Sequence, residues 1–586
     1  MSELYSAPLE DLEFMLFDVL RCEQLFSTQD YGHVDAADLR GVLAAGGRFA
    51  SEVLAPIDAP GDAVGSRLEN GHVVTPPGFR EAYQAYVDDG WEGLDQPVAY
   101  GGQDLPVVVQ TAIAEMFNAA CHAFSMLPLM GKAAARLLIQ HADEDLRERI
   151  VPKLVSGEWA ATIVMTEAHA GSDVGRTRTT AVPEGDTYQL SGTKSFISFA
   201  DHDFTEQIVH LVLARTPGAA AGTRGLSLFL VPKHEMNDDG TLGDHNELKV
   251  MRVEQKMGIK ASPTCVLVFD GATGYRIGEE GDGLKALFAM VNTMRLETAI
   301  QGVAVAGKAT RKAIRYASQR PQGGTANAPP VAIIEHPDVR RMLLAMMAKT
   351  GGIRGLLMET ALNLDLARAG KTEEIRNYAL GQAEWLLPVC KAYATDIGFE
   401  VANLALQVHG GHGYIVDEGV EQYVRDSRVT SIYEGTNGIQ AIDLVLRKLI
   451  RDRGKRYYQF TARIRTELEE HADLAGASQL VENLHDALAR LDRISEIFLQ
   501  TDQNSQREVE AGAYPYLILV GLVTGAWMWL RMIAAARSDS AFDRRQRASG
   551  TFYAQHLLPD ATSLEQRALA GAESLDRLDS QDLATY

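Results

Sequence analysis

One glutamate in the C-terminal half of the sequence is placed to act as a base. Glu434 stands between Tyr433 and Gly435, within the segment 425–440. Apolar walls around this carboxylate would raise its pKa and make it a better base toward a weakly acidic carbon. Gly435 would let a ligand or another stretch of backbone come close. On this fragment alone, the simpler interpretation is an acidic residue at the first turn of a helix that begins near Asn437.

Four further segments combine glycines with hydroxyl, charged and aromatic residues. They are residues 165–173 (M-T-E-A-H-A-G-S-D), 191–198 (S-G-T-K-S-F-I-S), 256–262 (K-M-G-I-K-A-S) and 407–414 (Q-V-H-G-G-H-G-Y). Taken singly, each has a plain structural interpretation, since Thr166 can cap a helix and Phe196 can belong to a strand core. His409 and His412 could suggest a metal site, but the local sequence supplies no third ligand, so we expect no metal.

Together, the five segments resemble the signatures of the acyl-CoA dehydrogenase family in order and spacing. In chain order the family patterns are V-T-E-P-x-A-G-S-D, G-x-K-x-W/F-I-T/S, K-x-G-x-x-x-S, Q-x-x-G-G-x-G-Y/F and I-Y-E-G-T-x-x-I-Q, the last matched by residues 432–440. The resemblance covers roughly residues 8–450. The extension, residues 451–586, resembles that of the long members of the family, among them the very-long-chain and 3-methylmercaptopropionyl-CoA dehydrogenases.

The resemblance implies an FAD-dependent α,β-dehydrogenation of an acyl-CoA thioester to the trans-2-enoyl-CoA. Glu434 would take the α-proton and N5 of FAD the β-hydride, from opposite faces of the acyl chain. The Glu434 backbone N–H and a flavin ribityl hydroxyl would stabilise the negative charge that builds on the thioester oxygen. Electrons would then pass to electron-transferring flavoprotein. The alternatives are an acyl-CoA oxidase that uses O₂, and a non-catalytic flavoprotein scaffold on the same fold.

The resemblance also implies which residues contact the cofactor and the substrate. For FAD these are Met165, Thr166, Ser172, Phe196, Ser198, Arg320, Gln407, Gly411 and Thr436. For the acyl-CoA they are Ser172, Arg295, Tyr433 and Gly435. Arg320, Gln407 and Gly411 match positions that make contacts across a dimer interface, so the resemblance implies a homodimer in which the FAD site is completed by the partner.

The sequence departs from the family pattern at a few positions. Residues 321–323 (P-Q-G) lack the aromatic residue that would contact adenine, and Gly438 replaces a glutamine that some relatives carry. Some relatives place their base one residue before the arginine that Arg295 matches, where this chain has Met294, and this favours Glu434 as the base. Glu297 is off that position and is predicted to face solvent or a partner.

Hydrophobic periodicity predicts helices before residue 162, short strands between 188 and 269, and helices again from 284 onward. This order is typical of an α+β fold with segregated elements. With the resemblance, it predicts an N-terminal helical domain, a middle β-barrel-like domain, a C-terminal four-helix bundle and an extra C-terminal helical domain. The predicted limits are 1–40 for an N-terminal arm, 41–161, 162–283, 284–450 and 451–586.

Composition excludes some functions. The chain has 586 residues and a formal net charge of −22, which argues against nucleic-acid binding through a broad basic field. Its four cysteines are far apart and form no C-x-x-C pair, so neither a zinc ribbon nor a disulfide framework is expected. The N-terminus is acidic where a signal peptide would be basic. We expect a cytoplasmic protein, with a peripheral contact at the inner membrane face as the alternative.

One segment is long and apolar enough to span a bilayer. Residues 511–530 carry no charge, but they include Pro515 and three glycines, and Arg531 follows at once. We predict a buried helix of a C-terminal bundle, with membrane contact as the alternative. The acyl chain length is not determined, because it depends on how helices near residues 115–127 and the loop around Tyr433 close the acyl cavity.

Overall fold

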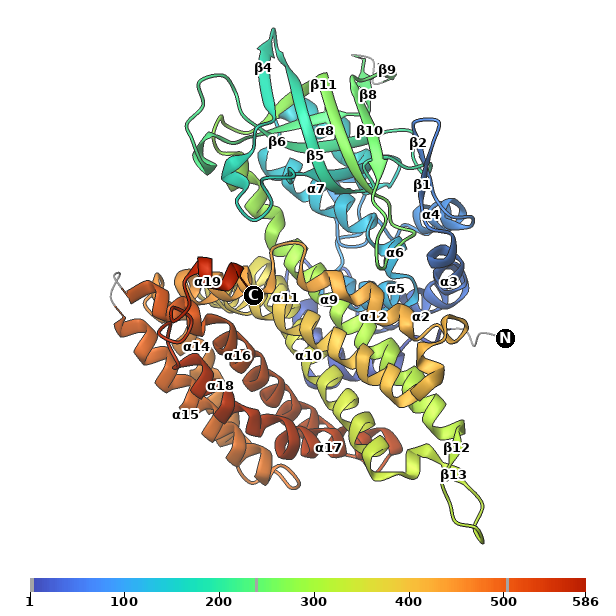
Figure 1. The fold of residues 1–586 in the computed structure, drawn as a ribbon, viewed down its shortest axis with the longest axis vertical. Coiled ribbons are helices and arrows are strands. Elements are labelled where there is room, and N and C mark those ends of the chain that lie inside the picture. Colours follow the sequence, from blue (N-terminus) through green and yellow to red (C-terminus); the bar gives the residue numbers. More distant parts are fainter. Residues whose placement is uncertain (1–4, 238–240, 502–504, 586) are drawn as a thin grey trace. The chain divides into compact units, whose positions relative to one another are not determined.

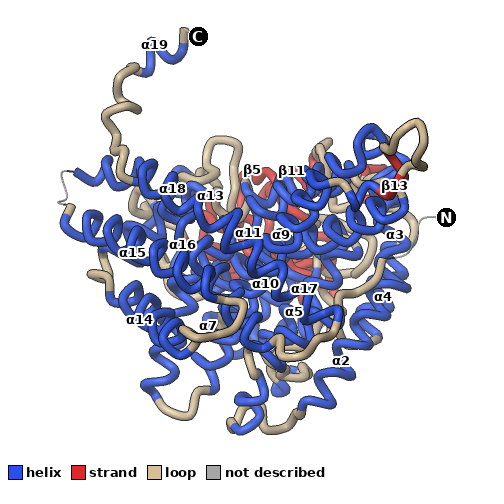
Figure 2. The backbone as a smooth tube through the Cα atoms, turned by 90° about the horizontal axis from the view of Figure 1, so that it is seen from below, coloured by secondary structure: helices blue, strands red, loops and turns tan. Residues whose placement is uncertain are grey.

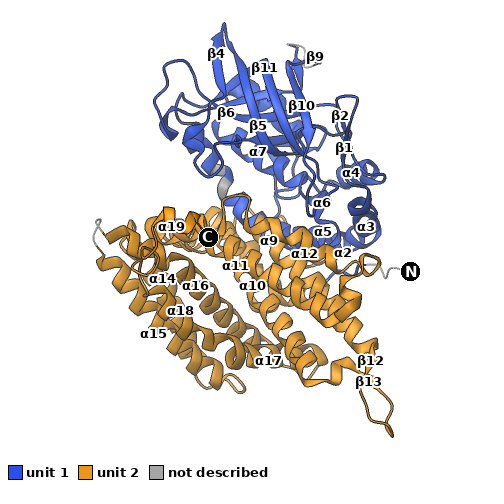
Figure 3. Cartoon of the chain, in the orientation of Figure 1, with its two compact units in different colours: residues 1–7, 41–297 blue, residues 8–40, 298–586 orange. Residues whose placement is uncertain are grey.

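The computed structural model of the protein describes residues 5–237, 241–501 and 505–585. The chain divides into two compact units (Figure 3). Unit 1 comprises Met1–Ala7 and Gly41–Glu297, and unit 2 comprises Pro8–Arg40 and Thr298–Tyr586. One border between the units falls inside a helix at residues 40–41 and another inside a long helix at residues 297–298, whereas the sequence placed a domain limit at residue 283. The limits of the five predicted domains stay predictions.

The first half of unit 1 is helical, as its periodicity predicted. Its helices are α2 (Ala36–Phe49), α3 (Ala55–Val64), α4 (Phe79–Asp88), α5 (Val107–Ala120), α6 (His122–Ser125), α7 (Pro128–His141) and α8 (Glu144–Val155). A small hairpin of β1 (Arg67–Glu69) and β2 (His72–Val74) interrupts them, which the sequence did not indicate. Helix α5 is buried on nearly all sides, because aromatic rings of Phe49, Tyr86 and Trp91 pack around its Phe117.

The second half of unit 1 is a seven-stranded sheet in the order β3-β6-β7-β11-β5-β4, with β10 paired to β11 (Figure 1). The strands are β3 (Ala160–Val164), β4 (Thr180–Glu184), β5 (Thr187–Ser198), β6 (Ile208–Ala214), β7 (Ser227–Pro232), β10 (Leu248–Val253) and β11 (Thr264–Ile277). Only β3 and β6 pair in parallel. Strands β6 and β7 are buried at every residue, which explains their unbroken apolar sequence. A two-stranded sheet of β8 (His234–Met236) and β9 (Leu242–His245) follows β7.

Unit 2 is helical apart from a small hairpin, β12 (Pro321–Gln322) with β13 (Val331–Ala332). Its long helices are α9 (Gly283–Gln319, which begins in unit 1), α10 (Pro337–Ala369) and α11 (Glu373–His409). Shorter helices follow: α12 (Glu421–Ser427), η10 (Arg428–Ser431), α13 (Asn437–Ile442) and η11 (Asp443–Ile450). The predicted N-terminal helix is present as α1 (Leu9–Glu13) and η1 (Phe14–Val19), and η1 packs against α10.

The extension supplies further helices to unit 2. They are α14 (Lys455–Glu470), α15 (Ser478–Gln500), α16 (Gln506–Ala535), α17 (Ala541–Phe552), α18 (Ala561–Ala568) and α19 (Ser580–Ala584). Figure 2 shows the chain leaving the other helices of this unit after α18 to end in α19. Helix α16 contains the apolar segment 511–530. Within the described residues it is the one helix long and apolar enough to cross a membrane, and 83% of its most apolar stretch is buried. The prediction of a buried helix is therefore confirmed.

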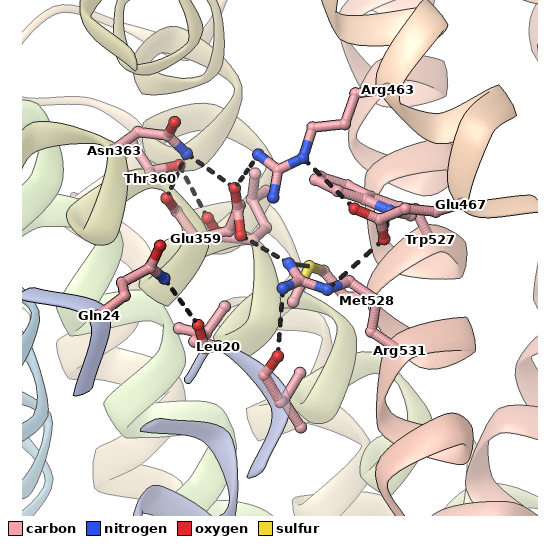
Figure 4. A network of polar contacts seen from close by, with 12 residues as sticks. Leu20, Gln24, Glu359, Thr360, Asn363, Arg463, Glu467, Trp527, Met528 and Arg531 are labelled. Atoms are coloured by element: carbon pink, nitrogen blue, oxygen red, sulfur yellow. Dashed lines mark hydrogen bonds and ion pairs between the residues drawn. The ribbon is translucent and has the colours of Figure 1, made fainter. Parts of the chain in front are cut away.

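A buried ionic network joins the extension to α10 (Figure 4). Glu359 on α10 is 1% exposed, and its two carboxylate oxygens accept from Arg463 Nη1 at 2.6 Å and Arg531 Nη1 at 2.7 Å. Both arginines also face Glu467, which accepts a hydrogen bond from the Trp527 indole at 2.7 Å. Because the ions come from three helices, α10, α14 and α16, the network holds the extension in register on the bundle.

Candidate active site

Two of the predicted cofactor segments lie side by side in unit 1. The backbone N–H of Ser195, near the end of β5, donates to the Thr166 carbonyl at 2.9 Å, and Lys194 Nζ donates to the Met165 carbonyl at 3.0 Å. These bonds bring Met165 and Thr166 next to Phe196 and Ser198. The resemblance assigned all four to FAD, and the structure brings them together.

Phe196 has the backbone and exposure of a functional residue and not of a strand core. Its φ is +62°, a conformation that is rare for a bulky residue, and its side chain is 64% exposed. Met165, Thr166 and Ser198 around it are half-buried. The strand-core interpretation of Phe196 is therefore wrong. An exposed ring flanked by half-buried hydroxyl groups fits a planar, polar ring system such as a flavin.

The segment 165–173 is held by Glu167, and no helix begins in it at Thr166. The buried Glu167 carboxylate accepts from the N–H of Arg178 at 2.9 Å, from the N–H and hydroxyl of Thr179 at 3.0 and 2.7 Å, and from Lys194 at 3.0 Å. Burial alone would raise the pKa of Glu167, but Lys194 and the hydrogen bonds lower it to about 2. This anchoring leaves Ser172 exposed beside Gly171, where an added Cβ would meet nothing. The backbone there is open to a ligand.

The Glu434 loop, residues 432–436, is a strained turn in unit 2 between η10 and α13. Glu434 has φ +54° and Gly435 has φ +80°. The helix cap is Thr436, whose hydroxyl accepts from the Ile439 N–H at 3.3 Å. The simpler interpretation of Glu434, as the acidic residue of the first helical turn, is therefore wrong. A non-glycine residue held in the left-handed region is typical of a functional site.

Two glutamines hold the Glu434 loop from opposite ends. The Gln440 amide donates to the carbonyls of Glu434 and Gly435 at 3.3 and 3.5 Å, and the Tyr433 hydroxyl donates to Gln301 on α9. A Cβ on Gly435 would lie 2.8 Å from Gln440 Nε2, so glycine is required by space as well as by φ. Among the described residues, no acceptor takes the backbone N–H of Glu434. That N–H is available to a ligand.

The charge of Glu434 is set by burial and one ammonium group. Burial raises the pKa of the half-buried Glu434 carboxyl, and Lys391 on α11 opposes the rise. The sequence predicted this elevation. A carboxylate whose pKa lies above its ordinary value is a stronger base toward a carbon acid.

The predicted contacts across a dimer interface gather at one end of the unit 2 bundle. Tyr316 stacks on His409 with ring centroids 4.3 Å apart, and its hydroxyl lies 3.1 Å from His412 Nδ1. These contacts hold the end of α9 against the end of α11. Arg320 follows α9 directly, and Gln407 and Gly411 flank His409; all three are exposed. In the described part of the chain, no group of three His, Cys, Asp or Glu side chains could hold a metal ion.

Unit 1 also contains a buried charged cluster that sequence reasoning missed. Lys132 Nζ on α7 donates to the Trp91 carbonyl at 3.0 Å and lies 3.9 Å from Asp95, which also pairs with Arg136. Burial raises the pKa of Glu92 to about 8 and that of Glu297 to about 7, although Lys132 opposes both shifts. The signal in the sequence that could have revealed this cluster was the presence of charged residues within apolar segments.

Glu297 and Lys132 line a cavity with a volume of about 20 Å³, enough for about one water molecule. Its other walls include Tyr86, Phe117 and Phe124. Glu297 is 8% exposed, so the prediction that it faces solvent or a partner is wrong. Lys132 on α7 supplies a cation that the local sequence of α9 does not reveal. Arg295 is also buried on this stretch of α9.

Glu92 makes the stability of the protein depend on pH. Its pKa is about 8 in the fold but near 4.5 in the unfolded chain. The contribution of Glu92 to the free energy of unfolding is therefore complete below its unfolded-state pKa and is lost as the pH rises toward 8. We expect Glu92→Gln to melt near the wild-type temperature at pH 5 and several degrees above it at pH 8. At pH 8 its free energy of unfolding should exceed that of the wild type by a few kcal/mol. Thermal unfolding at both pH values tests this, with the exposed Glu184→Gln as control. An equal difference at both pH values would contradict it.

Four family models match the chain in consecutive blocks. They are the acyl-CoA dehydrogenase N-terminal domain at residues 42–158, the middle domain at 162–272, the C-terminal domain at 281–449, and an acetyl-CoA dehydrogenase C-terminal-like domain at 460–579. The last model covers most of the extension.

Two relatives and a solved structure match this chain over nearly its whole length. The 3-methylmercaptopropionyl-CoA dehydrogenase of Ruegeria pomeroyi is 41% identical, over 97% of this chain and 99% of that protein. The broad-specificity linear acyl-CoA dehydrogenase FadE5 of Mycobacterium tuberculosis is 31% identical, over 96% and 97%. An acyl-CoA dehydrogenase of Bacillus anthracis, solved with FAD, shares the fold at 20% identity, with a TM-score of 0.75 over 94% of this chain and 90% of that one.

Proposed function

This chain belongs to the acyl-CoA dehydrogenase family, and we propose that it oxidises short acyl-CoA thioesters with Glu434 as the base. It is an FAD-dependent oxidoreductase. The structure of the Glu434 loop is the observation that supports Glu434 as the base. A carboxyl whose pKa burial raises stands in strained backbone, and its own N–H has no acceptor among the described residues.

The residues of the Glu434 loop divide the chemistry between them. The Glu434 carboxylate removes the α-proton and holds it on a side-chain oxygen. The Glu434 N–H donates to the thioester oxygen, where negative charge grows as the proton leaves. Gly435 lets the thioester approach the backbone, because no Cβ stands in its way. Bound FAD supplies the acceptor for the β-hydrogen and its two electrons.

The cofactor would be held by residues of the two motif segments of unit 1. Phe196 would pack on the flavin ring, while Met165, Thr166 and Ser198 would contact its edge. Ser172 would serve the pyrophosphate or the substrate. Arg320, Gln407, Gly411 and Thr436 complete the set, the first three in a homodimer. We further propose electron-transferring flavoprotein as the electron acceptor and the cytoplasm as the location.

The cavity of unit 1 favours short acyl groups. Helix α5 and the residues after it were predicted to close the acyl cavity, and in this region Tyr86, Phe117 and Phe124 leave only about 20 Å³. The buried amide oxygens of Gln110 and Asn118, which line it, have no hydrogen-bond partner in the described part of the chain. A long alkyl chain would require these rings to move and would bury both oxygens against methylenes. The relative from Ruegeria pomeroyi is named for a short thioether acyl group.

Anaerobic titration of the purified holoenzyme with acyl-CoA thioesters tests the proposal. The panel runs from C4 to C18 and includes branched and 3-methylthiopropionyl thioesters. We expect the oxidised flavin absorbance to disappear with the short members and to persist with C16 and C18. Persistence with every member would refute the function, and bleaching by the long members alone would refute the chain-length assignment. Rapid H₂O₂ formation in air would identify an oxidase instead.

A further inference from the structure

The helix that follows the Glu434 loop contacts both the bundle and the extension. Helix α13 packs against α11 and against α16. Its first residue, Asn437, is buried and directly follows the Thr436 cap. The position of Asn437 therefore fixes where the loop ends, three residues after the base.

Asn437 is tied to α11 through both ends of its amide. Lys391 Nζ donates to Asn437 Oδ1 at 2.9 Å. Asn437 Nδ2 donates to the Thr395 hydroxyl at 3.0 Å, to Asp396 Oδ1 at 2.8 Å and to the Ala392 carbonyl at 3.1 Å. This many bonds to one amide leave it little freedom to move.

The extension joins this group through Tyr514 on α16. The Tyr514 hydroxyl donates to Asp396 Oδ2, the carboxylate oxygen that Asn437 does not use. Burial raises the pKa of Asp396, while Tyr514, Asn437 and Lys391 lower it. The half-exposed Tyr514 thus connects the extension, through one carboxylate, to the first residue of α13.

Lys391 is unusual because its charge is completely buried. It is 0% exposed, and a buried ammonium is costly unless carboxylates compensate it. It acts on two carboxylates, Glu434 and Asp396, and opposes the rise that burial gives both pKa values. Of the neighbouring charges, Arg428 also lowers the pKa of Asp396, and Asp426 raises that of Tyr433.

We propose that the extension positions the catalytic base: Tyr514 holds Asp396, and Asp396 and Lys391 hold Asn437, the residue at which the Glu434 loop ends. This rests on the proposed function of Glu434. Tyr514, Asp396, Asn437 and Lys391 are positioning residues. The extension then has a part in the reaction, although none of its described residues forms a hydrogen bond or ion pair with Glu434.

The link to the extension is tested by amide hydrogen exchange on the holoenzyme without substrate, which needs no turnover, and by steady-state kinetics. Tyr514→Phe should speed exchange at the Ile439 and Gln440 amides, whose acceptors are the Thr436 hydroxyl and carbonyl, and should lower kcat more than it changes KM. The matched control is Tyr458→Phe, another half-exposed tyrosine of the extension. Equal exchange in the two variants and the wild type would overturn the link. If turnover fails for every thioester while exchange responds as expected, the proposed function fails and the positioning link stands.

Discussion

Glu434→Gln will lower the rate of flavin reduction by acyl-CoA about a thousandfold or more, within the range attributed to positioned bases and their combined effects. Glutamine keeps the size and shape of the side chain but cannot accept the α-proton. The Gln440 amide bonds to the carbonyls at positions 434 and 435, and these do not depend on the side chain. The loop should therefore keep its strained turn, and FAD should remain bound.

The measurement is stopped-flow reduction under anaerobic conditions, with the flavin content and melting temperature of each variant recorded beside it. Glu418→Gln is the control, because Glu418 is an exposed glutamate of the same unit and outside the loop. We expect the control to reduce at the wild-type rate. A Glu434→Gln enzyme that turns over like the wild type would show that another group is the base.

Glu359→Ala should destabilise unit 2 by about 3–5 kcal/mol, the usual cost of removing one partner from a buried ion pair. Without Glu359, the guanidinium groups of Arg463 and Arg531 lose their shared carboxylate in the interior. Glu467 can compensate only in part, because it also accepts from Trp527. The effect should exceed that of an ordinary surface substitution by several fold.

Urea unfolding followed by tryptophan fluorescence measures this loss. Asp576→Asn is the control, because Asp576 pairs with Arg507 on the exposed surface, where solvent screens the pair, and its loss should leave the midpoint nearly unchanged. Replacing Glu359, Arg463, Glu467 and Arg531 together by apolar residues of similar size should cost less than Glu359→Ala alone, since no charge of the network is then left unpaired. Equal midpoints for Glu359→Ala and the wild type would mean that the network contributes nothing.

The fold class and the family were predicted from the sequence, and both are confirmed. Periodicity placed the helices and strands because a buried face repeats along the chain in step with its secondary structure. It also identified α16 as a buried helix, since glycines and a proline interrupt its apolar run. The family resemblance assigned the segments 165–173 and 191–198 to one cofactor, and the raised pKa of Glu434 was expected from apolar walls around it. The roles of the site residues stay predictions.

By itself, the sequence determined the segments that carry chemistry and the backbone they require. Gly435 beside Glu434 predicted a close approach to the backbone, whereas the cap at Thr436 was found only in the structure. What only the tertiary structure decided is which charges are buried and what compensates them. The charge of Glu297 is compensated by Lys132 from another helix, and the contacts of Asn437 with Lys391 and of Asp396 with Tyr514 form only when α11, α13 and α16 pack together. The free energy of a buried charge depends on partners that the fold brings from far along the chain, and no local pattern records them.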